Sequence, residues 1–235
     1  MKPYIALLKH AIVAAICLGA LVLTMPSHAA TITWTDWSSV TAGNPGSGTG
    51  SIAPSITVTY SGQTTGRSVN YPSWTPTGSF SGGTVDNAPP RSFNSVALTG
   101  GNTNTNTLTF STAVVDPVFA IWSLGAPSVP ATFNFTSAEP FTLQGGGPSV
   151  EYGGSSITVS GNTVSGREGN GVIQFSGTFT QLTWTNPSAE SFYVFTVGIA
   201  GTAPPPTGVP EPASLLICGA GLAGLVFLRK FRRTV

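Results

Sequence analysis

An all-β fold is predicted for the central part of this chain from three observations. Only 7% of the residues are charged, while 29 are glycine and 19 are proline. Apolar and polar residues alternate in short segments, which is typical of half-buried strands. Gly, Asn or Pro separates these segments, and the connections are too short to hold crossover helices. The sequence therefore predicts an antiparallel β-sandwich or jelly-roll-like ectodomain, with an N-terminal signal peptide and one C-terminal transmembrane helix.

Residues 1–29 have the order of a secretory signal peptide. A short basic start precedes an apolar run at 11–23, and Pro and small residues follow it. We expect cleavage after Ala29, with cleavage after Ala30 as the alternative. The apolar run of about 13 residues is too short to span a bilayer comfortably, so the pattern favours a cleaved signal over an uncleaved anchor.

Residues 30–201 are predicted to form the β-rich extracellular domain. The Gly-rich stretch at 43–51 is expected to be a loop, and the run at 113–124 a strand that is buried on both faces. The expected strands are 31–37, 55–62, 93–98, 105–111, 113–124, 131–137, 141–144, 155–161, 162–166, 171–177, 178–186 and 190–199.

The segment from Gly66 to Pro90 is rich in Pro and Gly but also carries aromatic residues. It predicts an irregular excursion that either exposes its aromatics or covers one edge of the core. Trp37 and Trp74 lie beside loops in the sequence, so they are the candidates for stacking on sugar rings. Core positions are expected for the tryptophans inside strand patterns, which are Trp34, Trp122 and Trp184.

Residue types in the body exclude several classes of function. Both histidines and both cysteines fall within the two terminal segments, so the body lacks the usual catalytic triads, imidazole or thiolate metal sites and disulfides. Seven carboxylates stand against three arginines between residues 31 and 208, which argues against a nucleic-acid partner. We therefore expect no cofactor and no metal centre.

Carboxylates remain as the only residues of the body suited to acid–base chemistry. Hydrolysis of a glycosidic bond uses two of them on either side of that bond, although each carboxylate here lies in or beside a turn, where solvated surface acids are common. Calcium is also conceivable, but clustered Asp spacing is missing. The candidates are Asp116, Glu139, Glu151, Glu168 and Glu190.

Arg167 and Glu168 lie between glycines in the stretch from Val164 to Gly177. The pattern favours a hairpin turn with an ion pair at the surface, and a ligand-facing loop is the alternative.

The C-terminal segment combines a linker, an apolar stretch and a basic cluster. Residues 202–209 form a Pro-rich linker, and 213–228 are uncharged. As a helix, this apolar stretch reaches about 24 Å, somewhat less than the roughly 30 Å of a bilayer core. By the positive-inside rule the basic end stays cytoplasmic. The basic cluster at 229–233 contains Arg229, Lys230, Arg232 and Arg233.

Pro210, Glu211 and Pro212 stand directly before this apolar stretch. The order Pro-Glu-Pro, short hydrophobic helix, basic cluster and chain end over 210–233 closely resembles the PEP-CTERM sorting signal of Gram-negative bacteria. The resemblance implies recognition of these three residues by exosortase, a membrane-embedded transpeptidase-like enzyme. It also implies delivery to the cell exterior, often in bacteria that make exopolysaccharide. A permanent single-pass anchor is the alternative for this segment.

Together these features predict a secreted, non-enzymatic β-sandwich protein. We expect export through the inner membrane by the general secretion machinery, followed by sorting by exosortase to the cell surface or an exopolysaccharide (biofilm) matrix. The first alternative is an extracellular glycan-binding module, and the second is a secreted hydrolase that uses carboxylates alone.

Overall fold

The computed structural model describes residues 29–52, 55–68, 74–136 and 140–201. These residues form a 14-stranded sheet and one 3₁₀ turn, η1 (Thr77–Ser79). The strands are β1 (Thr33–Trp34), β2 (Asp36–Thr41), β3 (Gly43–Ile52), β4 (Ile56–Thr64), β5 (Gly66–Ser68), β6 (Ser95–Val115), β7 (Val118–Leu124), β8 (Ala131–Phe135), β9 (Phe141–Gly146), β10 (Ser155–Ser156), β11 (Thr158–Ser160), β12 (Thr163–Gly166), β13 (Gly169–Phe175) and β14 (Thr178–Ile199). Pairing is antiparallel throughout these strands except between β10 and β13, so the all-β prediction is confirmed.

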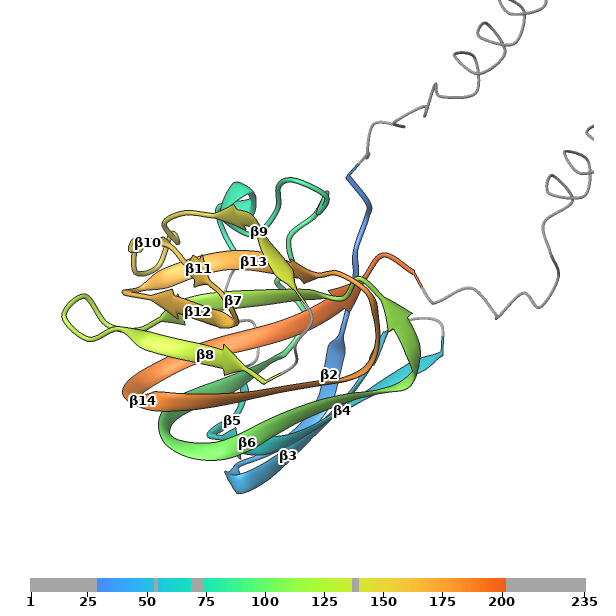
Figure 1. Ribbon diagram of the computed structural model, residues 1–235, viewed down its shortest axis with the longest axis horizontal. Helices are drawn as coiled ribbons and strands as arrows, with labels where there is room; N and C mark the ends of the chain where they lie inside the picture. Colours follow the sequence, from blue (N-terminus) through green and yellow to red (C-terminus); the bar gives the residue numbers. More distant parts are fainter. Residues whose placement is uncertain (1–28, 53–54, 69–73, 137–139, 202–235) are drawn as a thin grey trace, which may run out of the picture.

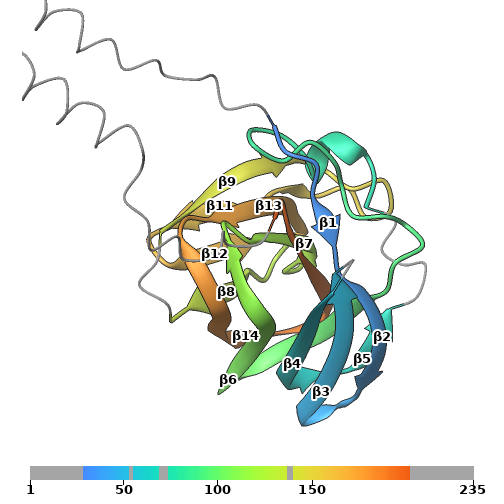
Figure 2. The same cartoon turned by 90° about the vertical axis from the view of Figure 1, so that its right-hand side faces the viewer.

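Two long strands, β6 and β14, connect two halves of the sheet. The first part of β14 pairs with the later part of β6 and with β8, and β4, β3 and β2 continue this half beyond β6. The last part of β14 pairs with the beginning of β6 and with β7, and β13 and β9 continue the second half. Viewed from the end, the strands enclose a common interior (Figure 2).

The sequence pattern predicted two short strands in place of each long one. A strand was expected to end before the pair Gly100–Gly101, yet β6 continues through it. Both glycines have positive φ, 62° and 77°, and the register with β14 shifts beside them. Such a bulge bends a strand without ending it, so β6 passes from one half to the other.

The prediction of a loop at 43–51 was wrong, because that whole segment belongs to β3. Trp37 on the neighbouring β2 explains why glycines are suited to this strand. A Cβ atom on Gly48 would lie 3.2 Å from the indole of Trp37, and one on Gly50 would lie 3.1 Å from the Trp37 Cα. Larger side chains would therefore crowd Trp37, so the Gly-rich composition reflects packing rather than a turn.

Aromatic side chains from the two halves pack against one another in the main core. Phe119 of β7 stacks on Phe195 of β14 with ring centroids 4.9 Å apart. Its ring also meets Phe133 of β8 and Trp184 of β14 edge-on, at 5.5 Å and 5.4 Å. All four side chains are fully buried, and edge-to-face pairs of this kind stabilise a core beyond the area that they bury.

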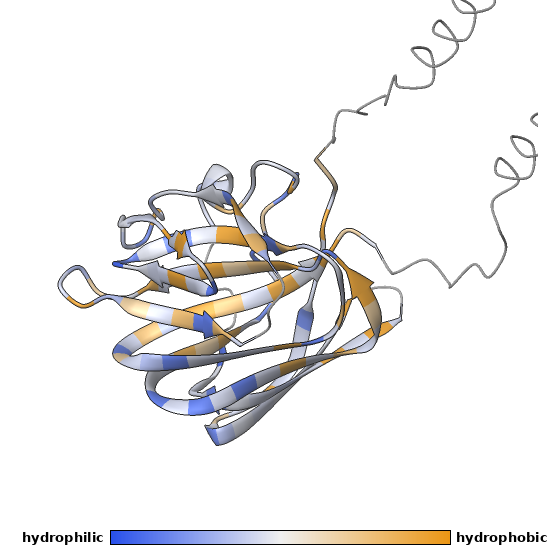
Figure 3. Ribbon diagram, in the orientation of Figure 1, coloured by the Kyte–Doolittle hydropathy of each residue, from blue (hydrophilic) through white to orange (hydrophobic). Residues whose placement is uncertain are grey.

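A second buried cluster lies on the opposite face of β7, β13 and β14. Trp74 and Phe80 from the irregular segment pack here against Trp122 of β7 and Val194 of β14. All seven residues of β7 are buried, as predicted for a strand covered on both faces, but the predicted strand at 113–124 is divided, because residues 113–115 end β6 and β7 begins after Pro117. The irregular segment therefore covers the core. Figure 3 shows β7 and much of β14 as apolar, while β3 is pale.

The two ends of the described domain lie side by side. Thr33 pairs with Ile199 and Trp34 with Gly198, because β1 adds to the end of β14. In Figure 1 both ends leave the domain on its right, whereas the connection between β7 and β8 projects on its left. Among the residues that the structure describes, no helix has the length and hydropathy needed to cross a membrane; the predicted helix at 213–228 lies outside them.

Candidate functional site

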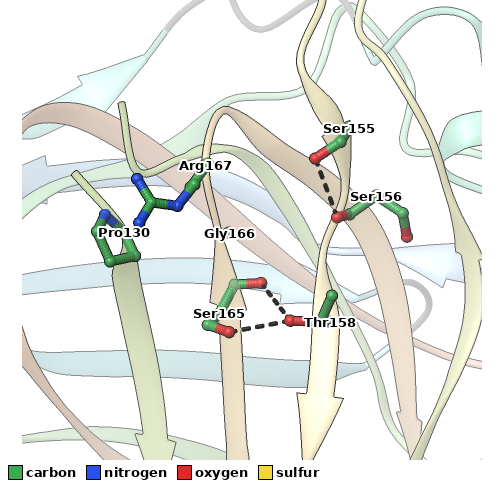
Figure 4. A pocket seen from close by; sticks show the side chains of 7 residues that line it. All are labelled: Pro130, Ser155, Ser156, Thr158, Ser165, Gly166 and Arg167. Carbon is green, nitrogen blue, oxygen red and sulfur yellow. Dashed lines mark hydrogen bonds between the residues drawn. The ribbon is translucent and has the colours of Figure 1, made fainter. Parts of the chain in front are cut away.

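Two pockets on the described domain are the candidates for binding a ligand. The larger one, of about 260 Å³, lies between the start of β8 and strands β10 to β12. Figure 4 shows its hydroxyl groups facing one another across β11 and β12, with Arg167 at one side. The lining consists of Pro130, Ser155, Ser156, Thr158, Ser165, Gly166 and Arg167.

Polar groups of this larger pocket are already bonded within the protein. The hydroxyls of Thr158 and Ser165 lie 3.0 Å apart, and the Ser156 hydroxyl donates to the Ile157 carbonyl. Arg167 donates from Nη1 to the Pro127 carbonyl at 3.3 Å. A ligand would have to displace these bonds, and the walls offer it no aromatic surface, so the pocket is poorly suited to specific recognition.

The second pocket, of about 200 Å³, has a different lining. Two carboxylates, two hydroxyls and two aromatic rings surround it. We call it the Glu168–Glu190 pocket; its residues are Ser123, Tyr152, Glu168, Glu190, Ser191 and Phe192.

Ser123 and Glu168 form one wall of this pocket. The Ser123 hydroxyl donates to Glu168 Oε2 at 2.6 Å, across 45 residues of sequence. Both residues have left-handed backbone conformations, with φ of 58° and 49°. Left-handed non-glycine residues are uncommon and concentrate at functional sites, and here two of them are directly bonded.

Glu190 forms the opposite wall. Its Oε2 accepts the Gly125 backbone N–H at 2.8 Å, and the Phe192 backbone N–H also bonds the carboxylate. Burial raises the pKa of Glu190 to about 7; the two backbone N–H groups oppose the rise, and the nearby Glu168 charge adds to it. Glu190 therefore changes its protonation near neutral pH.

Asn170 connects the wall formed by Ser123 and Glu168 with the turn that carries Tyr152. Its side chain is fully buried in β13. The amide oxygen accepts the Ser123 backbone N–H at 2.9 Å, and Nδ2 donates to the carbonyls of Gly153 and Glu168 at 3.2 Å and 3.0 Å. A further bond reaches the Gly147 carbonyl at 3.3 Å. The Asn170 side chain thus positions Ser123, Glu168 and the turn that carries Tyr152.

Tyr152 supplies the aromatic wall. It is 54% exposed, although its ring lies 5.2 Å from that of buried Trp122. Phe192 approaches the same indole edge-on at 5.9 Å. The turn that presents Tyr152 is closed by reciprocal backbone bonds between Ser149 and Gly153. The ring is therefore held in place with much of its surface in solvent.

Of the predicted acids, the structure brings two together and separates a third. Glu168 and Glu190 share the pocket, and Glu151 precedes Tyr152 in the turn. Asp116 precedes β7, at the end remote from the pocket, where its Oδ1 accepts the Gly177 N–H at 2.7 Å. Glu139 lies outside the described residues. Within the described ranges no group of three or more His, Cys, Asp or Glu is placed to hold a metal ion.

The prediction that Trp37 and Trp74 stack on sugar rings was wrong. Trp37 is 0% exposed and donates from Nε1 to the Thr196 hydroxyl, while Trp74 is 1% exposed and meets Phe80 edge-on. Neither ring has a face in solvent. Core positions for the other three tryptophans are confirmed, since Trp34, Trp122 and Trp184 are all buried.

The predicted surface ion pair between Arg167 and Glu168 was also wrong. Each side chain has another partner, Pro127 for the guanidinium and Ser123 for the carboxylate. The left-handed backbone at Glu168 turns the two side chains toward different pockets. The alternative of a ligand-facing loop remains a prediction.

Sequence reasoning missed Ser123, Tyr152 and Asn170. Tyr152 stands in a Gly-rich turn, where an aromatic residue has few apolar neighbours in the chain, and that context is the one signal that pointed to it. Ser123 lies in an apolar run and Asn170 in a Gly-rich strand, so neither is distinguishable by local pattern. Their roles arise from pairing between distant strands.

The predicted sorting residues lie at or beyond the limits of the described structure. Pro210, Glu211, Pro212 and the basic cluster at 229–233 are outside it. At the other end, Ala30 is bonded through its backbone to Thr84 and Asp86, at 2.8 Å and 3.0 Å. The ordered domain therefore includes Ala30, and cleavage after Ala29 stays a prediction.

Comparisons with known proteins bear on the C-terminal segment. A family model described as the PEP-CTERM protein-sorting motif matches residues 208–233. Neither the curated proteins nor the solved structures gave a match to this chain. The matched range contains the Pro-Glu-Pro tag, the apolar stretch and the basic cluster in the expected order. The chain is therefore a protein that carries the PEP-CTERM sorting motif.

Proposed function

We propose that this chain is a secreted, non-enzymatic β-sandwich protein that exosortase sorts to the cell surface or to an exopolysaccharide matrix. The PEP-CTERM motif at 208–233 is the observation that carries the proposal. Export through the inner membrane precedes sorting, and the motif's apolar stretch holds the protein in that membrane until it is processed.

The physical chemistry of the tag supports its role as a recognition element. Proline on either side of Glu211 prevents the helix of the apolar stretch from extending into the tag. The tag is then an extended peptide at the membrane surface, where a membrane enzyme can bind it. Basic residues after the apolar stretch favour the cytoplasmic side, so they keep the span in place until cleavage.

The position of the two domain ends is compatible with this route. Because Thr33 and Ile199 are paired, the segments before and after the domain leave it at one place. The opposite end of the domain is therefore the one farther from the sorting segment. Sparse charge and the absence of His and Cys in the body suit a structural or binding role better than catalysis.

A glycan-binding module is the second candidate function, and the Glu168–Glu190 pocket favours it. The pocket also keeps a carboxylate-dependent hydrolase as a further alternative, because two acids line it and the pKa of one of them, Glu190, is raised to about 7, which suits acid–base chemistry. A test for enzymatic turnover of the glycan distinguishes a binding module from a hydrolase. A binding module leaves its glycan intact, whereas a hydrolase releases a product and loses that activity in Glu190→Gln.

Substitution of Glu211 tests the proposal directly. The full chain and its Glu211→Gln variant are produced in cells with and without an exosortase, and the length of the product is followed by immunoblotting. The wild-type chain is expected to shorten only where exosortase is present, and Glu211→Gln is expected to stay full length. Asp36→Asn, at an exposed position of the domain, is the matched control and should be processed normally. Equal processing of Glu211→Gln and wild type would refute recognition through the tag.

A further inference from the structure

We propose that the Glu168–Glu190 pocket binds one ring of a neutral saccharide, with the ring's apolar face on Tyr152 and its hydroxyls on the two carboxylates. The assignment deepens the proposed extracellular function, on which its choice of a matrix glycan rests. Sugar rings combine an apolar face with a rim of hydroxyl donors, so they need one aromatic surface and nearby acceptors.

The aromatic surface is fixed before any ligand arrives. Tyr152 rests against Trp122 on one side and leaves 54% of its surface in solvent. The backbone of its turn is closed at Ser149 and Gly153, and Val150 N–H donates to the Thr75 carbonyl at 2.9 Å. Binding on such a surface costs little conformational entropy, because the ring is already oriented.

The carboxylates provide the acceptors. Ser123 occupies one position on Glu168, and backbone N–H groups occupy two positions on Glu190. A carboxylate offers about four lone-pair positions, so both groups retain capacity for hydroxyl donors. Hydrogen bonds to charged acceptors are stronger than neutral ones. Two carboxylates that line the same pocket can therefore accept bonds from hydroxyls of one ring.

Charge selects among saccharides. The six residues that line the pocket include two acids and no Lys or Arg, so an anionic sugar would be repelled. A hard cation such as Ca²⁺ takes six to eight oxygen ligands, and two partly engaged carboxylates fall short of that number. A cavity of about 200 Å³ is smaller than the pockets that hold drug-sized ligands. These features together favour a single uncharged ring.

The pocket opens at the end of the domain that faces away from the chain ends. Val118 at the start of β7 pairs with Gly198, next to the terminal pairing of β1. Ser123 lies near the other end of β7, about 16 Å further along the strand. A polymer chain can therefore approach this side of the domain without meeting the segments that precede and follow it.

The experiment measures binding of neutral oligosaccharides to the full chain in a detergent without sugar headgroups. The probes are tetrasaccharides of glucose, mannose and galactose in α and β linkage, titrated by calorimetry at pH 8, where Glu190 is ionised. We expect at least one probe to bind. Tyr152→Ala and Glu190→Gln should each weaken that binding roughly tenfold or more. Tyr152→Phe should retain it, because the ring face is preserved.

Two surface variants serve as matched controls. Val150→Ala alters the same turn at a position 70% exposed, and Asp36→Asn removes an exposed acid elsewhere. Both should bind like the wild type. No binding to any probe, or binding that is equal in wild type and Tyr152→Ala, would overturn the assignment. Binding of Ca²⁺ that is lost in Glu190→Gln, without saccharide binding, would assign the pocket to a cation and also overturn it.

Processing of the same variants separates this inference from the proposed function. Pocket variants should be shortened by exosortase like the wild type. Loss of saccharide binding with normal processing would leave the sorting proposal standing. Binding that persists in a chain that exosortase does not shorten would leave the pocket standing and remove the sorting route.

Discussion

Thr33 and Ile199 are paired across β1 and β14, although 166 positions of sequence separate them. The pairing places both ends of the described domain at one site, and the Glu168–Glu190 pocket lies toward the other end of β7, beside residues 190–192 in the middle of β14. One domain thus has a side for attachment and a side for contact with the surroundings. That division is compatible with the sorting motif at 208–233, which follows the domain in the chain.

Contact between the two sheet halves should depend on Phe119. Its ring meets the rings of Phe133, Trp184 and Phe195, so Phe119→Ala leaves a cavity between the halves. We expect the free energy of unfolding to fall by about 3 to 5 kcal/mol. Denaturant unfolding followed by tryptophan fluorescence measures it. Leu143→Ala, at a position 42% exposed, is the control and should change it by less than about 1 kcal/mol.

Asn170 should be a structural requirement of the pocket. Asn170→Ala removes the acceptor of the Ser123 N–H and one donor to each of the Gly147, Gly153 and Glu168 carbonyls. Buried groups without partners destabilise a fold, and we expect a loss of about 2 to 4 kcal/mol. The exposed Asn104, whose side chain donates to Asn44 Oδ1, is the comparison. If Asn104→Ala and Asn170→Ala unfold at the same denaturant concentration, Asn170 does not hold the walls together.

Stability should fall as the pH rises through the range in which Glu190 titrates. The ordinary carboxyl pKa is 4.5 and that of folded Glu190 is about 7, so between these values the folded state holds a proton that the unfolded state has lost. The stability that the protein gains from this bound proton is therefore fully present below pH 4.5 and is lost above pH 7. Glu168 and Tyr193 are the titratable groups coupled to Glu190, and burial keeps Tyr193 neutral by raising its pKa.

Thermal unfolding between pH 4.5 and 8 measures this effect. The melting temperature of Glu190→Gln should vary less with pH than that of the wild type, because the amide does not titrate. Asp86→Asn, an acid at the surface, controls for the loss of a carboxyl group. If the melting temperature of the wild type rises from pH 4.5 to 7 in parallel with that of Glu190→Gln, the pKa of Glu190 is not raised in the folded protein.

The sequence predicted the parts of the fold that depend on local pattern. Alternation identified most strands, and the apolar residues at 118–124 correctly indicated β7 as covered on both faces, although the predicted strand at 113–124 also included the end of β6. Local pattern could not identify β3, because its glycines leave space for the indole of Trp37 on a neighbouring strand. Continuity of β6 through Gly100 and Gly101 was equally hidden, since the same pair can end a strand or bend it.

The candidate site was only partly accessible to sequence reasoning. Glu168 and Glu190 were among the candidate acids, but their proximity follows from the arrangement of β7, β13 and β14. Trp37 and Trp74 were chosen because they stand beside loops, and that criterion cannot distinguish a ring at the surface from one folded over the core. Tyr152, which does remain exposed, lies in a turn whose shape depends on Asn170.

The intact mass of the protein recovered from native culture tests the sorting account most directly. Membrane and extracellular fractions are measured separately. The account predicts an extracellular form that begins near Ala30 and ends close to Pro210–Pro212, with the apolar stretch and basic cluster removed. A mature form that retains Arg233 and stays in the membrane would contradict it, because the segment would then be a permanent anchor.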